Sequence, residues 1–176
     1  MRKRDLIHWL QNDSSRMHAL HTAGELGLND WCLAAGFVRN LAWDKMHEYT
    51  VPTVLNDIDL IYFNPSDTSI EKDAELECIL RERSSHPWSV KNQARMHMRN
   101  GDKAYTSTED AMSYWVEVET AVGARLGPLT HELEIVAPFG VGSLFENTIT
   151  LNAKRKNQEI SIRGLQQKTG VKSGRA

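Results

Sequence analysis

Apolar residues recur along the chain at two spacings, one typical of helices and one typical of strands. Segments of the two kinds alternate, which predicts a mixed α/β fold. Residues 3–27 carry apolar side chains three and four positions apart, which predicts two helices with a break at 12–15, where Asp13 or Ser14 would cap the second. Residues 30–36 predict a short strand that ends in glycine, and residues 37–49 predict a helix. A strand at 57–63 and a helix at 68–83, capped by Thr68 or Ser69, repeat the unit.

The second half of the chain favours further strands. Residues 88–98 alternate in polarity and predict one strand, with Lys91, Gln93 and Arg95 on its polar face. Ser107 is placed to cap a short helix, and residues 118–126 and 131–139 predict two strands joined by a turn. The expected fold is α/β (α+β), with a mixed sheet of four to five strands flanked by helices.

The domain organisation follows from the absence of an internal linker or repeat. We expect one folded domain over residues 1–151 and a basic, partly disordered tail over residues 152–176. The tail carries a net charge of about +6, and the rest of the chain carries about −8. Apart from Glu159, the charged residues of the tail are all basic: Lys154, Arg155, Lys156, Arg163, Lys168, Lys172 and Arg175. Two interpretations are open, a solvated terminus or an arm that docks nucleic acid.

Composition excludes several classes of protein. The chain is 25% charged and 40% hydrophobic, and no apolar run approaches the roughly 20 residues of a membrane span. The net charge of −2 gives no general attraction for nucleic acid or membranes, and residues 1–13 lack the apolar core of a secretory signal. Cys32 and Cys78 are expected to be buried free thiols. A cytoplasmic protein is predicted.

The strongest candidate chemistry is the pair Asp57 and Asp59 at the start of a predicted strand. Alternate side chains of a strand share a face, so the two carboxylates would stand together and repel each other unless a cation lies between them. Hard oxygen ligands of this kind select Mg²⁺ or Mn²⁺. The alternative is that Asn56 and Asp57 only close a turn.

A third carboxylate is available on the predicted strand 131–139. Glu132 and Glu134 would share one face of it, while Leu133 and Ile135 face the core. If that strand neighbours the aspartate pair, three acids converge. Two metal ions about 4 Å apart can then activate an attacking oxygen and neutralise a leaving pyrophosphate.

Other residues offer contacts to an anion or a base. Gly36 lets backbone approach a phosphate at a helix N-terminus, and Arg39 in the first turn can grip a phosphate or pair with a carboxylate. The alternative is a plain turn with a surface arginine. The row of Lys91, Gln93 and Arg95 is either a solvated edge or a set of donors for triphosphate and base.

The tryptophans belong to the core by default, although Trp88 or Trp115 can also stack on a base. No G-x-S-x-G elbow or P-loop motif occurs in the sequence, and the seven histidines show no zinc spacing.

Several blocks of the chain between residues 5 and 150 resemble a small bacterial family of nucleotidyltransferases whose fold is similar to the head domain of CCA-adding enzymes, in the DNA polymerase beta superfamily. The blocks are LAAGFVRNLAWDKMHEY, NDIDLIYF, WSVKNQARMH, YTSTEDAMSYWVEVETAVGARL and LEIVAPFG. In that superfamily a glycine turn precedes a D-x-[DE] strand, and a third acid lies on a later strand. Gly36, Asp57 with Asp59, and Glu134 match these positions, and GFVRN resembles the GGxVRD turn.

The chain departs from the family pattern at several points. Phe37 stands where Gly or Ser is usual, Gly36 and Asp57 are farther apart than is typical, and the third acid is Glu134, with Glu132 as the alternative. The segment after residue 150 is too short for the helical regions with which CCA-adding enzymes choose bases and hold tRNA. Templated or tRNA-end synthesis is therefore not expected.

The resemblance implies a metal-dependent transfer of a nucleoside monophosphate from an NTP to an unidentified acceptor, with release of pyrophosphate. Asp57, Asp59 and Glu134 would be the catalytic, Mg²⁺-binding (or Mn²⁺-binding) residues. Nucleotide binding would fall to a second set, consisting of Gly36, Phe37, Arg39, Lys91 and Arg95. The alternative is a nucleotide-binding or regulatory module with the same fold and no turnover.

Overall fold

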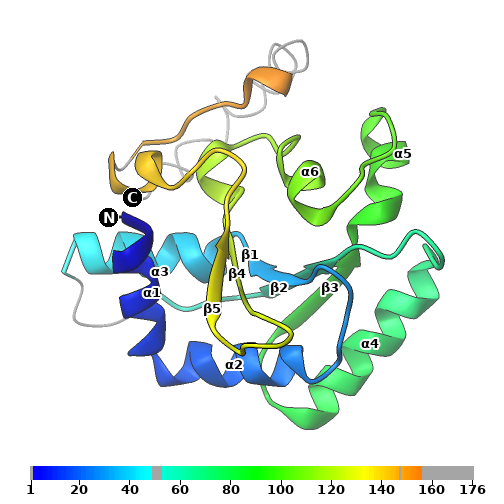
Figure 1. Cartoon of the computed structure of the whole chain (residues 1–176), viewed down its shortest axis with the longest axis horizontal. Helices are drawn as coiled ribbons and strands as arrows, with labels where there is room; N and C mark the ends of the chain where they lie inside the picture. The colour runs from blue at the N-terminus through cyan, green and yellow to red at the C-terminus, as the bar shows by residue number, and fades with distance from the viewer. Residues whose placement is uncertain (1, 49–52, 147, 156–176) are drawn as a thin grey trace.

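A five-stranded sheet forms the centre of the protein (Figure 1). The computed structural model describes residues 2–48, 53–146 and 148–155. The strands follow the order β3-β2-β1-β4-β5, and β2 runs parallel to β3 while the other neighbours are antiparallel. Their bounds are β1 Cys32–Ala34, β2 Ile58–Tyr62, β3 Trp88–Asn92, β4 Gly123–Leu126 and β5 Leu133–Val136. The predicted mixed sheet is confirmed.

Four helices build the main core on one face of the sheet. They are α1 Arg2–Gln11, α2 Ser14–Gly24, α3 Gly36–Met46 and α4 Ile70–Arg83, and each contributes buried side chains to one apolar cluster with the strands. The predicted caps are present, since the Asp13 side chain accepts from the Arg16 N–H and Ser69 accepts from the Lys72 N–H. Helices α5 Met96–Asn100 and α6 Thr108–Met112 lie on the opposite side of the sheet from α2 and α4 (Figure 1).

The alternation of β2 decides which side chains face α5 and α6. Ile58, Leu60 and Tyr62 enter the main core on one face of the strand. Ile61 joins a smaller cluster on the other face, and Asp59 shares that face because it is two residues from Ile61. The main core therefore holds the strand in place while the opposite face presents Asp59.

The predicted strand 88–98 ends at Asn92. The Asn92 side chain accepts the Ala94 N–H and donates to the carbonyls of Asn64 and Asp67, so the backbone turns into a 3-10 helix at Gln93–Arg95 and then into α5. The predicted strand 118–126 is also shortened, because a 3-10 helix occupies Val118–Thr120 and β4 begins at Gly123. Both changes bring irregular backbone to the same side of the sheet.

The packed part of the chain continues beyond residue 151. Asn152 is only 2% exposed, and short 3-10 helices occupy Gly142–Glu146 and Ala153–Arg155. The rest of the predicted tail, residues 156–176, lies outside the described residues. Cys32 is buried as expected, whereas Cys78 is exposed because it lies on the outer side of α4. Across the described ranges, no helix combines the length and apolarity that crossing a membrane requires.

Candidate functional site

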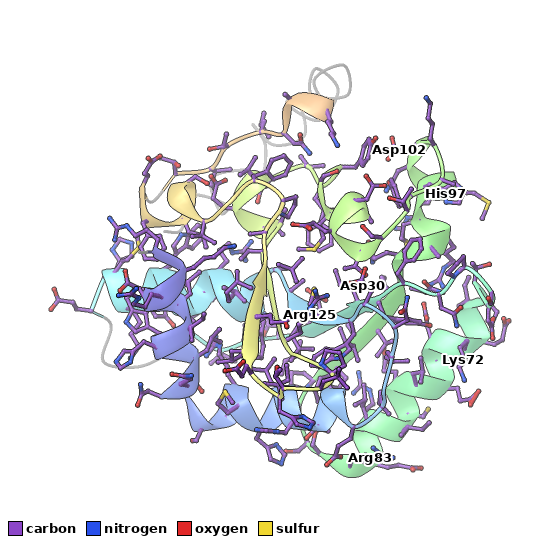
Figure 2. The ribbon with its side chains drawn as sticks, viewed as in Figure 1. Asp30, Lys72, Arg83, His97, Asp102 and Arg125 are labelled. Atoms are coloured by element: carbon purple, nitrogen blue, oxygen red, sulfur yellow. The ribbon has the colours of Figure 1, made fainter. Side chains whose placement is uncertain are left out.

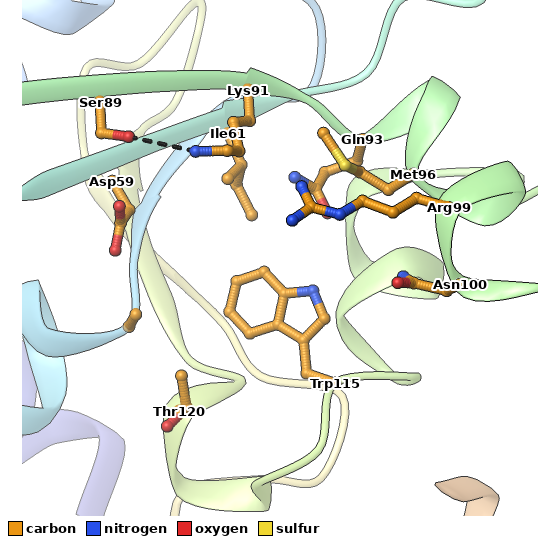
Figure 3. Close-up of a pocket in the computed structure, with 11 residues that line it drawn as sticks. Asp59, Ile61, Ser89, Lys91, Gln93, Met96, Arg99, Asn100, Trp115 and Thr120 are labelled. Carbon is orange, nitrogen blue, oxygen red and sulfur yellow. Dashed lines mark hydrogen bonds between the residues drawn. The ribbon is translucent and has the colours of Figure 1, made fainter. Parts of the chain in front are cut away.

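A pocket of about 410 Å³ opens on the face of the sheet that carries Asp59 (Figure 3). Its walls come from β2, β3, the start of α3, α5 and the 113–120 segment. The residues that line it are Ala35, Asp59, Ile61, Ser89, Lys91, Gln93, Met96, Arg99, Asn100, Trp115 and Thr120. One acidic and two basic side chains thus share a polar cavity with an indole ring.

The parallel pairing of β2 and β3 places an acid beside a lysine. Asp59 lies opposite Ser89, and Ile61 lies opposite Lys91, so all four side chains project from the same face. The Lys91 ammonium is 3.5 Å from the Ser89 hydroxyl (Figure 3). The floor of the pocket therefore combines a carboxylate, a hydroxyl and an ammonium group within two neighbouring strands.

Asp57 and Asp59 interact electrostatically. Burial raises the pKa of Asp59, the charge of Asp57 raises that pKa further, and Lys91 and Arg39 act in the opposite direction. Asp57 is exposed just before β2, whereas Asp59 is half-buried. The pair holds two negative charges in a partly desolvated place, which a bound cation would stabilise.

The start of α3 forms one rim of the pocket. Ala35 has φ 60° and ψ −127°, a conformation that L residues rarely adopt, and no side chain of the described residues caps the helix. Gly36 leaves little room, because a Cβ there would lie 3.2 Å from Asn40 Nδ2. The first N–H groups of α3 are therefore available to an anion.

The side chain of Phe37 does not reach the pocket. It is fully buried in the main core, and its carbonyl accepts a hydrogen bond of 2.7 Å from Arg16 Nε. Phe37 can contribute to ligand binding only through its backbone N–H. This explains how a large residue is accommodated where the family pattern has a small one.

Arg39 stands behind the pocket rim. Its Nη1 donates to Thr120 Oγ1 at 3.0 Å and its Nε donates to Asn40 Oδ1 at 3.2 Å, while the guanidinium lies over the Trp43 ring. Since Thr120 lines the pocket, the Arg39 charge is close to its edge and lowers the pKa of Asp59.

Glu134 is not brought to the aspartate pair. It faces the same side of the sheet as Asp59, but β5 and β2 are separated by β4 and β1, which amounts to roughly 14 Å at about 4.8 Å per strand. Arg125 Nε donates to Glu134 at 3.0 Å, and Arg125 Nη1 donates to Asp30 at 2.8 Å. Figure 2 labels Arg125 and Asp30. Glu132 is exposed in the turn before β5. The condition for three converging acids, neighbouring strands, is not met.

Arg95 does not share a face with Lys91, because the strand has already ended. Its guanidinium pairs with Asp73 of α4 and points toward the carbonyls of Thr68 and Ser69. Asp73 is 5% exposed and also accepts from the Tyr62 hydroxyl. The expectation that Arg95 lines the site with Lys91 is therefore wrong, and Arg95 instead stabilises the start of α4.

Comparison with known proteins identifies the family. A family model described as nucleotidyltransferase matches residues 21–173. The chain belongs to this nucleotidyltransferase family. A solved NMR structure described as revealing a CCA-adding enzyme head domain is 31% identical, with a TM-score of 0.80 over 94% of this chain and 86% of that one. The predicted family and fold are confirmed.

Two structures of a tRNA-processing enzyme, one a complex and one the apo form, share the fold. Each is 16% identical with a TM-score of 0.52, and the match covers 82% of this chain but only 38% and 39% of theirs. No curated protein matches the chain. The nucleotidyltransferase fold is thus shared with larger proteins of which this chain spans about two fifths.

A metal ion in this nucleotidyltransferase would rely on few protein ligands. Among the residues with described positions, no group of three or more His, Cys, Asp or Glu has a metal-binding arrangement. Asp57 and Asp59 nevertheless fit Mg²⁺, which typically keeps several waters and binds through one or two carboxylates plus substrate phosphates. Burial and, after it, the charge of Asp57 raise the pKa of Asp59, and a bound cation would offset the repulsion between the two carboxylates.

Several pocket residues escaped the sequence analysis. Met96, Arg99 and Asn100 lie on α5, whose first three residues fall within the predicted strand 88–98. Thr120 lies in a 3-10 helix that the pattern did not reveal. The available signal for the α5 residues was Asn92, a residue type that favours leaving regular structure.

Proposed function

We propose that this chain transfers a nucleoside monophosphate from an NTP to an acceptor, with release of pyrophosphate, in the Asp59 pocket. The observation that carries the proposal is that Asp59, whose carboxylate feels the charge of the neighbouring Asp57, lines the same cavity as Lys91 and as Ala35 at the start of α3. A polyanion and a metal ion would both find complementary charge there.

Asp57 and Asp59 are the proposed holders of Mg²⁺, or of Mn²⁺ in its place. The ion would supply Lewis-acid polarisation of the phosphoryl group and neutralise charge on the departing pyrophosphate. The half-buried position of Asp59 on a strand anchored in the core fixes the direction of its carboxylate. Glu134 has no role in this proposal, because it is paired with Arg125.

The triphosphate is assigned to the rim formed by α3 and to Lys91. Backbone N–H groups of Gly36 and Phe37 would bind phosphate oxygens at the positive end of the helix dipole. Lys91 would neutralise further charge from the floor of the pocket. Arg39 would orient Thr120 and add positive potential from behind it.

The setting proposed for this reaction is the bacterial cytosol. NTP and magnesium are the expected small-molecule partners, and no acceptor is assigned. Cys32 and Cys78 are both free thiols, the state that a reducing compartment maintains.

The test is a screen of the four NTPs with Mg²⁺, with and without cell extract as a source of acceptor, for release of pyrophosphate. Release that depends on extract supports the transfer. Binding of Mg²⁺–NTP without release under any condition favours the alternative, a nucleotide-binding or regulatory module. Deletion of residues 152–176 tests the basic arm. An affinity for RNA or DNA that the deletion leaves unchanged, or that shows no salt dependence, would exclude it.

A further inference from the structure

The pocket has a second end, away from the aspartates, that is built for a flat polar ring. Figure 3 shows Asp59 and Ser89 on one side and Gln93 with Arg99 on the other, with the indole of Trp115 between them. The proposed metal and phosphate groups account for the first side only. The second side contains an aromatic face and amide and guanidinium groups that those roles leave unused.

Gln93 points to a ligand because its polar end has no partner. The residue is 4% exposed, yet its side-chain amide forms no hydrogen bond with any described residue. The amide still meets the solvent of the pocket, since it is not among the buried side-chain atoms that lack a partner, and a ligand that displaces this solvent must supply hydrogen bonds in its place. Because Gln93 lines the cavity, a bound group with both a donor and an acceptor along one edge would satisfy it.

Trp115 is held as a rigid platform beside this amide. One side of the indole packs against the cluster that contains Ala34 and Ile61. The backbone of Trp115 is held on both sides, because its carbonyl accepts from the Asn152 side chain at 2.7 Å and its backbone N–H donates to the Met112 carbonyl at 3.0 Å. A platform fixed in this way can stack on a base with little loss of side-chain entropy.

We propose that this end of the pocket binds the base of the donor nucleotide and favours purines. The inference rests on the proposed function, since it assigns the base of the same NTP. The two fused rings of a purine cover more of the indole than a pyrimidine does. The Gln93 amide and the Arg99 guanidinium match the purine edges, since glutamine pairs with N6 and N7 of adenine and arginine pairs with O6 and N7 of guanine.

The experiment measures binding of ATP, GTP, CTP, UTP and inorganic tripolyphosphate to the full chain with Mg²⁺ and no acceptor. Tripolyphosphate carries the phosphates without a base. We expect Trp115→Ala to weaken ATP and GTP about tenfold or more while tripolyphosphate changes less than about twofold. Trp115→Phe, which keeps an aromatic face, should restore most of the affinity.

Gln93→Met keeps the size of the side chain and removes its polar atoms, so it should reduce the difference in affinity among the four NTPs. Equal weakening of NTPs and tripolyphosphate by Trp115→Ala would overturn the base site, and so would pyrimidine nucleotides that bind as tightly as purines. If the wild type binds neither NTP nor tripolyphosphate, the proposed function fails with it. If it binds both equally, only the base site fails.

Discussion

The side chain of Asn152 donates to the backbone carbonyl of Trp115 over 2.7 Å and to that of Ser113 over 2.7 Å. This contact ties a segment near the C-terminus to the wall of the pocket. The bridge between Glu117 and Leu151 and the hydrogen bond from Val118 N–H to the Thr150 carbonyl extend the same attachment. The position of the indole therefore depends on chain that follows the last strand of the sheet.

Asn152→Ala should destabilise the protein by about 1–3 kcal/mol, since it leaves buried carbonyls without donors. It should also raise the KM for NTP more than it lowers kcat, because Trp115 loses its support. Chemical denaturation and steady-state kinetics measure the two effects. Lys154→Ala is the matched control, because Lys154 is exposed and its ammonium contacts the Ser113 hydroxyl and the Tyr114 ring without touching Trp115; equal effects of the two variants would contradict this account.

Lys91→Ala and Arg95→Ala separate a proposed ligand contact from a structural ion pair. Arg95→Ala leaves Asp73 as an unpaired carboxylate that is 5% exposed, so it should lower the free energy of unfolding by roughly 3 kcal/mol or more. Lys91→Ala should leave stability nearly unchanged and weaken NTP and tripolyphosphate. Denaturation and binding titrations of both variants decide it: an Arg95→Ala protein of normal stability with lost nucleotide binding would reverse the assignment.

Ala35→Gly should stabilise the unliganded protein by roughly 1 kcal/mol. The positive φ of 60° strains alanine by about 1–3 kcal/mol, and glycine would relieve this strain. The greater conformational freedom of glycine in the unfolded chain offsets about 0.4–1 kcal/mol of that stabilisation. Thermal unfolding measures the change. Ala42→Gly is the control: Ala42 lies in the interior of α3, which Ala35 precedes, so this substitution should destabilise the protein by about 1 kcal/mol or more. A loss of stability in Ala35→Gly would show that the turn is not strained.

The pair His18 and His86 should make stability depend on pH. His18 Nδ1 lies 3.0 Å from His86 Nε2, and burial, followed by the charge of His18, lowers the pKa of His86. Below the ordinary histidine pKa of about 6.5 the unfolded chain therefore binds more protons than the folded one, so stability falls as the pH drops through this range.

The measurement is the free energy of unfolding at pH 7.5 and at pH 5.5 for the wild type and for His86→Gln. The decrease between the two pH values should be smaller in the variant. An equal decrease in both proteins would assign the pH dependence to other groups.

The helices, the strands and their caps could be predicted because each depends on local chemistry. The spacing in α4 and the capping by Asp13 and Ser69 are visible in short windows of sequence. The order of strands is not local. Periodicity gave the correct face for Glu134, yet it contains no information on whether β5 lies next to β2, and the actual partner of Glu134 is Arg125 of β4.

The pocket itself was predicted only in part, for a related reason. Asp59 and Lys91 lie in regular strands, so their shared face follows from the period of two. Arg99 and Thr120 lie in helical segments that begin where a strand was expected. Arg95 was misplaced because the side-chain hydrogen bonds of Asn92 ended the strand three residues earlier.

Pyrophosphate release by Asp59→Asn and Glu134→Gln, measured side by side with the wild type, tests the central claim most directly. Asp59→Asn should lower the rate at least about 100-fold, since loss of a group that stabilises transition-state charge costs about 2.7–4 kcal/mol. Its unliganded fold should be intact, because the substitution removes a charge that burial and Asp57 disfavour. Glu134→Gln should retain most of the rate, because its carboxylate contacts Arg125 on another part of the sheet. Full activity in Asp59→Asn, or its loss in a folded Glu134→Gln protein, would contradict a catalytic site at Asp59.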